Sequence, residues 1–186
     1  MKDVKVFLNG ERIKLNFKKY CEMFINALHE ETGGEEKPVI TWEVVNDRWE
    51  VAFAASGGNF QQVSFVNSIA TTSGGTHVNY IADQLCTHLQ GALKKQNKSG
   101  AAVKNAQMRN HFFIFVNCLI ENPAFTSQTK EQLTTRSGAF GSKCTLSDTF
   151  FKNVLKNTPV ISNIIDYANM KADKQLKKTD GSRRSR

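Results

Sequence analysis

Residues 111–120 of the chain read HFFIFVNCLI. Nearly every position is apolar, which is typical of a strand that is buried on both faces of a sheet. A loop that leaves such a strand is held in place by a rigid core, and rigid placement favours contact with a ligand. The loop after residue 120 is therefore a candidate site, and it contains Gln128, Thr129 and Lys130.

Two side chains of this loop suit an anionic oxygen. Lys130 supplies a compact ammonium group, and Gln128 supplies amide donors two residues earlier. A short polar motif of this kind is, by itself, more typical of an exposed loop without a ligand. Its significance therefore depends on the rest of the chain.

Alternating and apolar patterns predict the other strands. Asn9-Gly10 and Asn46-Asp47 are turn signals, and each joins two strand patterns into a predicted hairpin. Trp42 and Trp49 are expected to pack in the second hairpin rather than to stack on a ligand. The predicted strands span residues 4–8, 12–15, 39–45, 48–55, 60–70 and 111–120.

Apolar residues at helical spacing predict five helices. Asn16 and Thr76 are the expected N-caps of the first two, and Gly181 is expected to end the last. The predicted helices span residues 17–32, 77–95, 102–109, 148–157 and 159–180. The strand at 60–70, the helix after it and the buried strand follow in the order of a βαβ unit. The fold class is therefore α/β, with these two strands expected to pair in parallel.

The composition predicts one soluble, globular domain. A chain of 186 residues with 40% apolar residues can build a core. No stretch approaches the ~20 apolar residues of a membrane span, and the N-terminus lacks the apolar core of a signal peptide. The four cysteines are too widely spaced for a zinc motif, so they are expected to be reduced and structural, which indicates an intracellular protein.

The net charge of +8 is unevenly distributed. Residues 84–120 contain five basic residues and no acid, and residues 171–186 contain seven basic residues and two acids. Each zone therefore carries +5, and the rest of the chain carries −2. A polyanionic partner would meet two basic zones on a nearly neutral body.

The sequence shows no free-standing active site. It contains no Ser/His/Asp arrangement, cysteine cluster or carboxylate pair that would indicate one, and its four histidines have no metal-ligand spacing. We expect this chain to bind no metal and to be catalytically silent when isolated.

Three motifs, in order along the chain, resemble the transducer domain of type IIA DNA topoisomerases. They are FVNSIATT at residues 65–72, GGTHV at 74–78 and QTK at 128–130. The stretch FVNCLIENP at 115–123 is similar to the eukaryotic nuclear form rather than to bacterial gyrase. The resemblance covers almost the whole chain.

The resemblance implies an α/β (α+β) fold with a mixed sheet and helices on one side. It also implies a left-handed βαβ crossover, as in the ribosomal-S-five domain 2-like transducer fold, whereas the general expectation is a right-handed one. Residues 1–157 would form the transducer body, including the QTK loop. Residues 158–186 would form a long C-terminal helix and a basic linker toward a DNA-cleavage core.

The resemblance also implies a function for the candidate loop. Lys130 would reach the γ-phosphate of ATP as a catalytic and cofactor-binding residue, and Gln128 would assist as a second cofactor-binding residue. The ATP would be shared with an upstream ATP-binding domain of the GHKL class, and Mg²⁺ would be needed only in the parent enzyme. The parent would be a homodimeric, nuclear DNA topoisomerase without a membrane partner, in which this module relays the nucleotide state to DNA-gate opening and strand passage.

Lysines at the end of the second helix are candidate contacts to double-stranded DNA. Lys94, Lys95 and Lys98 match a lysine-rich loop that the family often carries on the side that lines the DNA cavity. Lysines are favoured at helix C-termini whatever the function, so a solvated helix end is the default interpretation. Binding would involve phosphates, without sequence preference and with steep salt dependence.

Gly74 and Gly75 are expected to form the turn between strand and helix rather than a phosphate cradle, because the lysine and spacing of a phosphate-binding loop are missing. His77 is expected to fix that turn by hydrogen bonding and has no catalytic role. One alternative is a DNA-binding module that uses the basic loop and tail. Another is a transducer of another GHKL family, but the GGTHV and QTK motifs argue against it.

Overall fold

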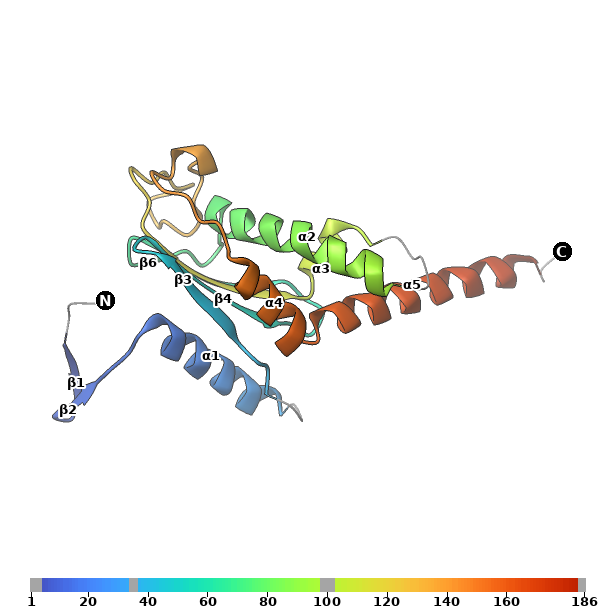
Figure 1. The fold of residues 1–186 in the computed structure, drawn as a ribbon, viewed down its shortest axis with the longest axis horizontal. Coiled ribbons are helices and arrows are strands. Elements are labelled where there is room, and N and C mark those ends of the chain that lie inside the picture. The colour runs from blue at the N-terminus through green and yellow to red at the C-terminus, as the bar shows by residue number, and fades with distance from the viewer. Residues whose placement is uncertain (1–4, 34–36, 98–102, 184–186) are drawn as a thin grey trace.

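A five-stranded mixed sheet forms the centre of the fold (Figure 1). The computed structural model describes residues 5–33, 37–97 and 103–183. The strand order is β3-β4-β7-β5-β6, and a separate hairpin is formed by β1 and β2. The strands are β1 (Val6–Leu8), β2 (Glu11–Ile13), β3 (Thr41–Asn46), β4 (Trp49–Ala55), β5 (Gln61–Val66), β6 (Ile69–Ala70) and β7 (Phe112–Cys118).

The strand predicted to be buried on both faces, β7, is the middle strand of this sheet. It pairs antiparallel with β4, with Ile114 opposite Phe53, and parallel with β5, with Phe115 opposite Val63. The helices α2 (Thr76–Gln96) and α3 (Asn105–Arg109) lie between β5 and β7 in the chain. The predicted parallel βαβ pairing is therefore confirmed, while the hand of its crossover stays a prediction.

Helices cover both faces of the sheet, not one face as expected. On one face, α1 (Phe17–Thr32) packs Cys21 and Ile25 against Phe113 and Phe115. On the other face, α2, α4 (Asp148–Asn157) and the start of α5 (Val160–Arg183) pack against the alternate residues of β4 and β7. Because β4 and β7 are apolar on both sides, both sides must be covered to remove them from water. Figure 1 shows α1 and α2 on opposite sides of the strands.

The strand predicted over residues 60–70 is wrong in its second half. It ends at Val66, and Asn67 and Ser68 turn the chain with φ angles of 51° and 67°. Positive φ at both central residues is the requirement of the tight hairpin turn that matches strand twist, and asparagine tolerates it well. β6 then returns antiparallel beside β5.

The boundaries of α1 follow the prediction, whereas the N-cap of α2 differs from it. Asn16 caps α1 by accepting a hydrogen bond from the Lys19 amide at 2.8 Å. Thr76, however, is the first residue of α2, and Gly75 occupies the N-cap position. The Thr76 hydroxyl instead donates to the Thr135 carbonyl oxygen at 2.6 Å.

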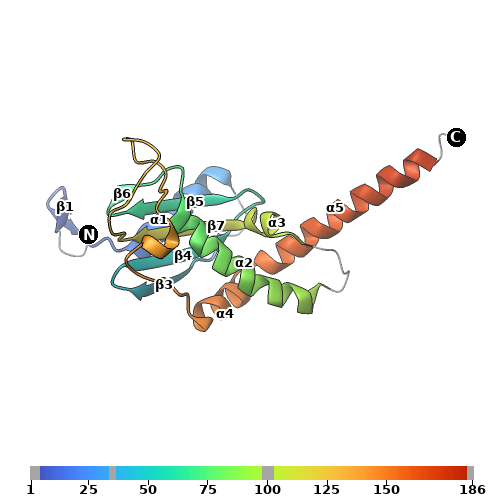
Figure 2. The same ribbon diagram turned by 90° about the horizontal axis from the view of Figure 1, so that it is seen from above.

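Two further helices differ in length from the sequence prediction. α3 begins at Asn105 rather than at residue 102, which lies outside the described residues. α5 continues through Gly181 to Arg183, so the glycine does not end it. A single glycine costs a helix roughly 1 kcal/mol, which does not by itself stop one. In both views α5 extends away from the sheet (Figures 1 and 2).

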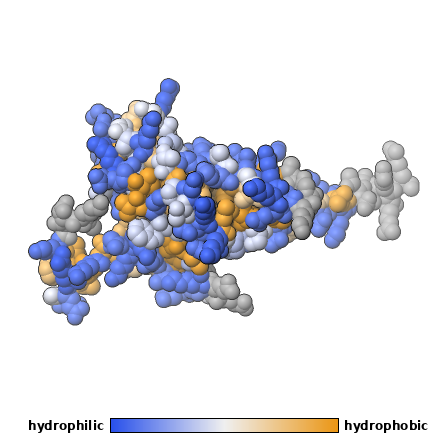
Figure 3. All heavy atoms as spheres, in the orientation of Figure 1, coloured by the Kyte–Doolittle hydropathy of each residue, from blue (hydrophilic) through white to orange (hydrophobic). Residues whose placement is uncertain are grey.

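The predicted hairpin of β1 and β2 is confirmed, with Val6 opposite Ile13. Its residues are exposed throughout, and Figure 3 shows apolar residues at its surface.

No helix in the described part of the chain combines the length and the apolar character that a membrane span requires.

Candidate functional site

The QTK motif lies at the tip of an irregular hairpin, residues 124–134, which we call the QTK arm. Phe125 and Leu133 form an antiparallel bridge. The Thr126 amide donates to the Gln132 carbonyl oxygen at 3.1 Å, and the Thr134 amide donates to the Ala124 carbonyl oxygen at 2.9 Å. The arm extends from the end of the body where α2 begins, in both ribbon views (Figures 1 and 2).

The tip is a tight turn that holds Lys130 in an unusual backbone conformation. The Lys130 amide donates to the Ser127 carbonyl oxygen at 3.0 Å, and the φ angle of Lys130 is 58°. A left-handed residue other than glycine costs about 1–3 kcal/mol and is often found at functional sites. Gln128 is exposed and Lys130 is half-buried. Within the described ranges, neither side chain has a hydrogen-bond or ion-pair partner.

An asparagine clamp at the end of β7 anchors the base of the arm. Asn67 Nδ2 donates to the Ile120 carbonyl oxygen at 3.0 Å, and the Ile120 amide donates to Asn67 Oδ1 at 2.9 Å. The Glu121 amide then donates to the Phe140 carbonyl oxygen at 3.1 Å. These hydrogen bonds hold the base of the arm rigidly, as the apolar pattern of the preceding strand predicted. The strand pattern around Asn67 hid its role, although Asn-Ser is a usable turn signal.

A second set of bonds joins the arm to the turn before α2. The Leu133 amide donates to the Gly74 carbonyl oxygen, and the Thr76 amide donates to the Leu133 carbonyl oxygen, each at 3.1 Å. The Ser73 amide donates to the Glu131 carbonyl oxygen at 2.9 Å. Gly74 and Gly75 thus form the predicted turn between strand and helix, and Gly75 also forms a short parallel bridge to Leu133 of the arm.

His77 fixes this turn, as predicted. Its side chain is buried, and Nε2 lies 3.0 Å from Oγ1 of Thr71. Burial lowers the pKa of His77 from its ordinary value of 6.5 to about 4, because a charged imidazolium would lose its hydration. His77 is therefore neutral at physiological pH, which fits a positioning role and not acid–base chemistry.

This shift predicts a pH-dependent stability. The unfolded chain binds a proton on His77 near pH 6.5, and the folded chain does so only near pH 4. The stability contribution is therefore complete above pH 6.5 and is lost as the pH falls toward 4. We expect the wild-type chain to lose about 2 kcal/mol more than His77→Gln between pH 7 and pH 5.

Urea unfolding of both chains at each pH measures this difference. Burial also lowers the pKa of His111, so part of the acid sensitivity remains in the variant. Parallel loss of stability in the two chains would contradict the assignment to His77.

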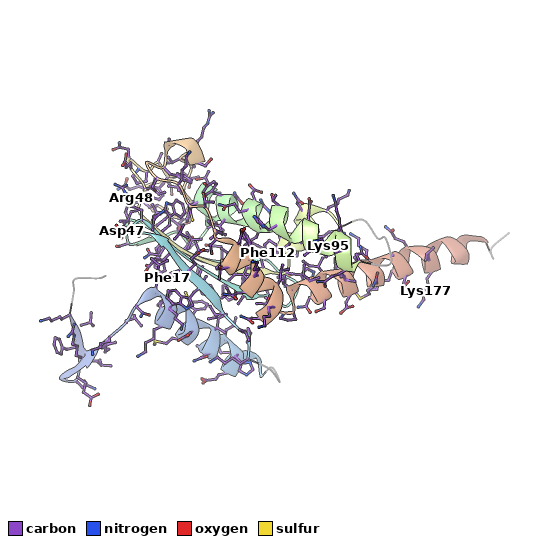
Figure 4. All side chains as sticks on the ribbon, in the orientation of Figure 1. Phe17, Asp47, Arg48, Lys95, Phe112 and Lys177 are labelled. Carbon is purple, nitrogen blue, oxygen red and sulfur yellow. The ribbon has the colours of Figure 1, made fainter. Side chains whose placement is uncertain are left out.

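The candidate DNA contacts lie at the other end of α2. Lys94 and Lys95 are exposed in its last turn, and Lys98 lies outside the described residues. A helix of 21 residues is roughly 30 Å long, so the structure does not bring these lysines and the QTK arm together. Figure 4 labels Lys95 at this end of α2, and Lys177 farther along α5. The helices α2 and α5 contact each other, and Lys171, Lys174 and Lys177 of the second basic zone are exposed on α5.

The cysteines are free and buried, as expected. Burial raises the pKa of Cys21 and of Cys144 to about 12, and it raises the pKa of Cys118 and Cys86 as well. These thiols are therefore not reactive thiolates. The described residues contain no group of histidine, cysteine, aspartate and glutamate side chains that could hold a metal ion.

Known proteins resemble the chain over nearly its whole length. The family model for DNA gyrase B matches residues 16–183. DNA topoisomerase 2 of Penicillium chrysogenum is 60% identical over 98% of this chain, but the chain spans only 12% of that relative. The ATPase region of Saccharomyces cerevisiae topoisomerase II matches 89% of the chain at 50% identity, with a TM-score of 0.75, and the match covers 40% of that structure. The ATPase and transducer domains of DNA topoisomerase II from Balamuthia mandrillaris match 91% at 42% identity, with a TM-score of 0.78, over 40% of that structure.

Proposed function

Because the chain belongs to the DNA gyrase B family and is a fragment of the ATPase and transducer region of a eukaryotic-type DNA topoisomerase II, we propose that it acts as the transducer module of that ATP-dependent enzyme. In this proposal Lys130 contacts the γ-phosphate of ATP. This proposal rests on the surroundings of Lys130. The Lys130 ammonium group has no partner among the described residues, and the arm that carries Lys130 is held by hydrogen bonds at its base and along its side.

The chemistry of a lysine suits the proposed contact. An ammonium group neutralises negative charge on the phosphoryl group that is transferred, and a pre-positioned charge costs no reorganisation during the reaction. Gln128, exposed two residues earlier, offers amide donors to the same phosphate. The upstream domain would hold the rest of the nucleotide and Mg²⁺.

The same contact allows the module to report hydrolysis. Lys130 gains a partner only while the γ-phosphate is present, so the triphosphate state favours one position of the arm. The arm is bonded to the first turn of α2, and α2 contacts α5. We propose that the nucleotide state is relayed along this path toward the DNA gate.

The test replaces Lys130 by alanine in a protein that joins this chain to its upstream ATP-binding domain. We expect kcat for ATP hydrolysis to fall about a hundredfold, because one charge contact to the reacting phosphate is removed. Steady-state hydrolysis kinetics measure this change. Lys130→Arg keeps the charge and is expected to retain part of the rate.

Lys143 provides the control, because it is an exposed lysine close in sequence to the arm. Lys143→Ala should leave kcat unchanged. An unchanged kcat in Lys130→Ala would refute the proposed contact. An equal loss of kcat in both variants would attribute the loss to the positive charge of the region and not to Lys130 itself.

A second candidate function, DNA binding, is favoured by one observation. The tertiary structure packs α2, whose last turn carries the exposed Lys94 and Lys95, against α5, whose Lys171, Lys174 and Lys177 are exposed. Basic zones that are separate in the sequence thus lie on two helices that contact each other. A surface of this kind suits the phosphates of a duplex.

The salt dependence of DNA binding tests this surface. We expect the double variant Lys94→Ala/Lys95→Ala to reduce the slope of log affinity against log salt by up to about 2, since each phosphate contact contributes roughly 0.9. The joined protein is titrated with duplex DNA at several salt concentrations. Lys5→Ala/Lys14→Ala removes the same charge from two exposed lysines near the other end of the chain, and its slope should not change. Equal slopes in all three proteins would remove the α2 end from the interface.

The place of this chain in a parent enzyme is also part of the proposal. Residues 1–157 would be the transducer body and residues 158–186 the connection toward the cleavage core. The parent enzyme would be a homodimer that acts on double-stranded DNA in the nucleus. The left-handed crossover belongs to the same proposal.

A further inference from the structure

The QTK arm and the first turn of α2 are bonded as one unit. Three backbone hydrogen bonds cross between residues 73–76 and residues 131–133, and two of them involve Leu133 on both its amide and its carbonyl oxygen. Glu131, which is bonded to Ser73, directly follows Lys130. The position of Lys130 therefore depends on the position of the turn before α2.

A chain of four side chains fixes that turn to β5. Gln62 Nε2 donates to the carbonyl oxygens of Thr71 and Thr72, at 3.2 and 2.9 Å, which turns Gln62 Oε1 toward Ser64. Ser64 Oγ donates to this Oε1 at 2.6 Å. The Ser64 hydroxyl thus has its proton committed and can accept from Thr71 Oγ1, which lies 2.5 Å away.

The direction of these bonds determines the tautomer of His77. Thr71 Oγ1 directs its proton toward Ser64, either to Oγ or to the carbonyl oxygen at 3.1 Å. The remaining role of Thr71 Oγ1 is to accept, so His77 Nε2 must carry the proton and donate. His77 Nδ1 is then a bare acceptor, and it is buried without a partner among the described residues. The chain of donors runs from His77 through Thr71 and Ser64 to Gln62.

Solvent cannot replace the bond between His77 and Thr71. His77 is 0% exposed and Thr71 is 1% exposed. A buried donor that loses its partner bears the full cost of desolvation. The bond therefore links the first turn of α2 to the segment that enters the glycine turn.

We propose that His77 is a positioning residue that holds the QTK arm, and with it Lys130, in register with the first turn of α2. The inference rests on the proposed contact of Lys130 with the nucleotide, and it adds the device that maintains the geometry of that contact. His77 acts through Thr71 and the glycine turn and touches neither substrate nor reacting atoms.

Amide hydrogen exchange of this chain tests the link without any nucleotide. In His77→Leu we expect the amides of Ser73, Thr76 and Leu133 to exchange about tenfold faster, the change for one lost buried hydrogen bond, while the amides between β4 and β7 keep their rates. In His77→Gln, whose amide nitrogen can take the place of Nε2, we expect near-wild-type exchange. A variant that merely destabilises the fold would accelerate all of these amides together.

Kinetics of the joined protein provide a second readout. We expect His77→Leu to lower kcat and to have no further effect in the Lys130→Ala background, because both changes act through the same contact. Thr71→Val breaks the same chain of hydrogen bonds and serves if His77→Leu does not fold.

Unchanged exchange at the three amides, or rate losses that multiply in the double variant, would overturn the inference. An unchanged kcat in Lys130→Ala would instead overturn the proposed function, and the exchange data would still decide whether His77 holds the arm.

Discussion

Replacing Gly75 by alanine is expected to lower the free energy of unfolding by about 3 kcal/mol or more. Gly75 has a φ angle of 137°, which an L side chain rarely adopts. A Cβ atom there would lie within 3.0 Å of the backbone N, Cα and O of Leu133. Backbone atoms cannot rotate away as a flexible side chain can, so the bridge between arm and helix must open or α2 must shift.

Guanidinium unfolding of the chain measures this loss. Gly91 offers the matched control, because it is an exposed glycine inside α2, and the position that an alanine methyl group would take there has open space around it. Gly91→Ala should be neutral or should stabilise the chain by about 0.4–1 kcal/mol, since alanine favours the helix. If Gly75→Ala were as stable as Gly91→Ala, the close approach of Gly75 to Leu133 would be disproved.

Truncation of Trp49 to alanine is expected to cost about 3–5 kcal/mol. The side chain is fully buried, and its ring centroid lies 5.6 Å from that of Phe140 and 6.1 Å from that of Tyr80. Its Nε1 also donates to Ser142 Oγ at 2.8 Å. Trp49 thus ties β4 to the segment that follows the QTK arm.

Trp42 is the natural comparison for this variant. It is 41% exposed on the edge strand β3, where Lys18 Nζ lies 5.2 Å from its ring centroid. Trp42→Ala should cost less than about 1 kcal/mol. Denaturant midpoints of the two variants distinguish them, and equal costs would show that burial does not explain the role of Trp49. Trp49→Phe keeps most of the ring packing and should fall between them.

Local patterns predicted the elements well. The Asn9-Gly10 turn, the Asn16 cap and the buried strand at Phe112–Cys118 are all present in the structure, whereas the second hairpin turns at Asp47 and Arg48, one residue later than predicted. Each depends on residues that are close along the chain, because turn chemistry, capping and hydrophobic periodicity act over a few positions. The exceptions have local causes too. Asn67 and Ser68 carry a hairpin turn inside a strand-like pattern, and Gly75 takes the cap position expected of Thr76.

The candidate site was predictable only in part. Residues 128–130 could be singled out from the sequence, because a loop after a buried strand is rigidly placed. The bonds that place it could not. The Asn67 clamp on Ile120 spans 53 residues of sequence, and the bridge to Leu133 joins two loops with no repeating pattern. A hydrogen bond between distant segments leaves no periodic signal in either of them.

The amino-acid sequence was sufficient for the α/β class, the parallel βαβ unit and the motif that carries Lys130. The folded chain was needed for the rest: the cover of helices on both faces, the contact between α2 and α5, and the hydrogen-bonded connection from His77 to the QTK arm. The physical reason is the range of the forces involved. Element type follows from neighbours a few residues away, whereas packing and hydrogen bonding between elements depend on which surfaces the folded chain brings together.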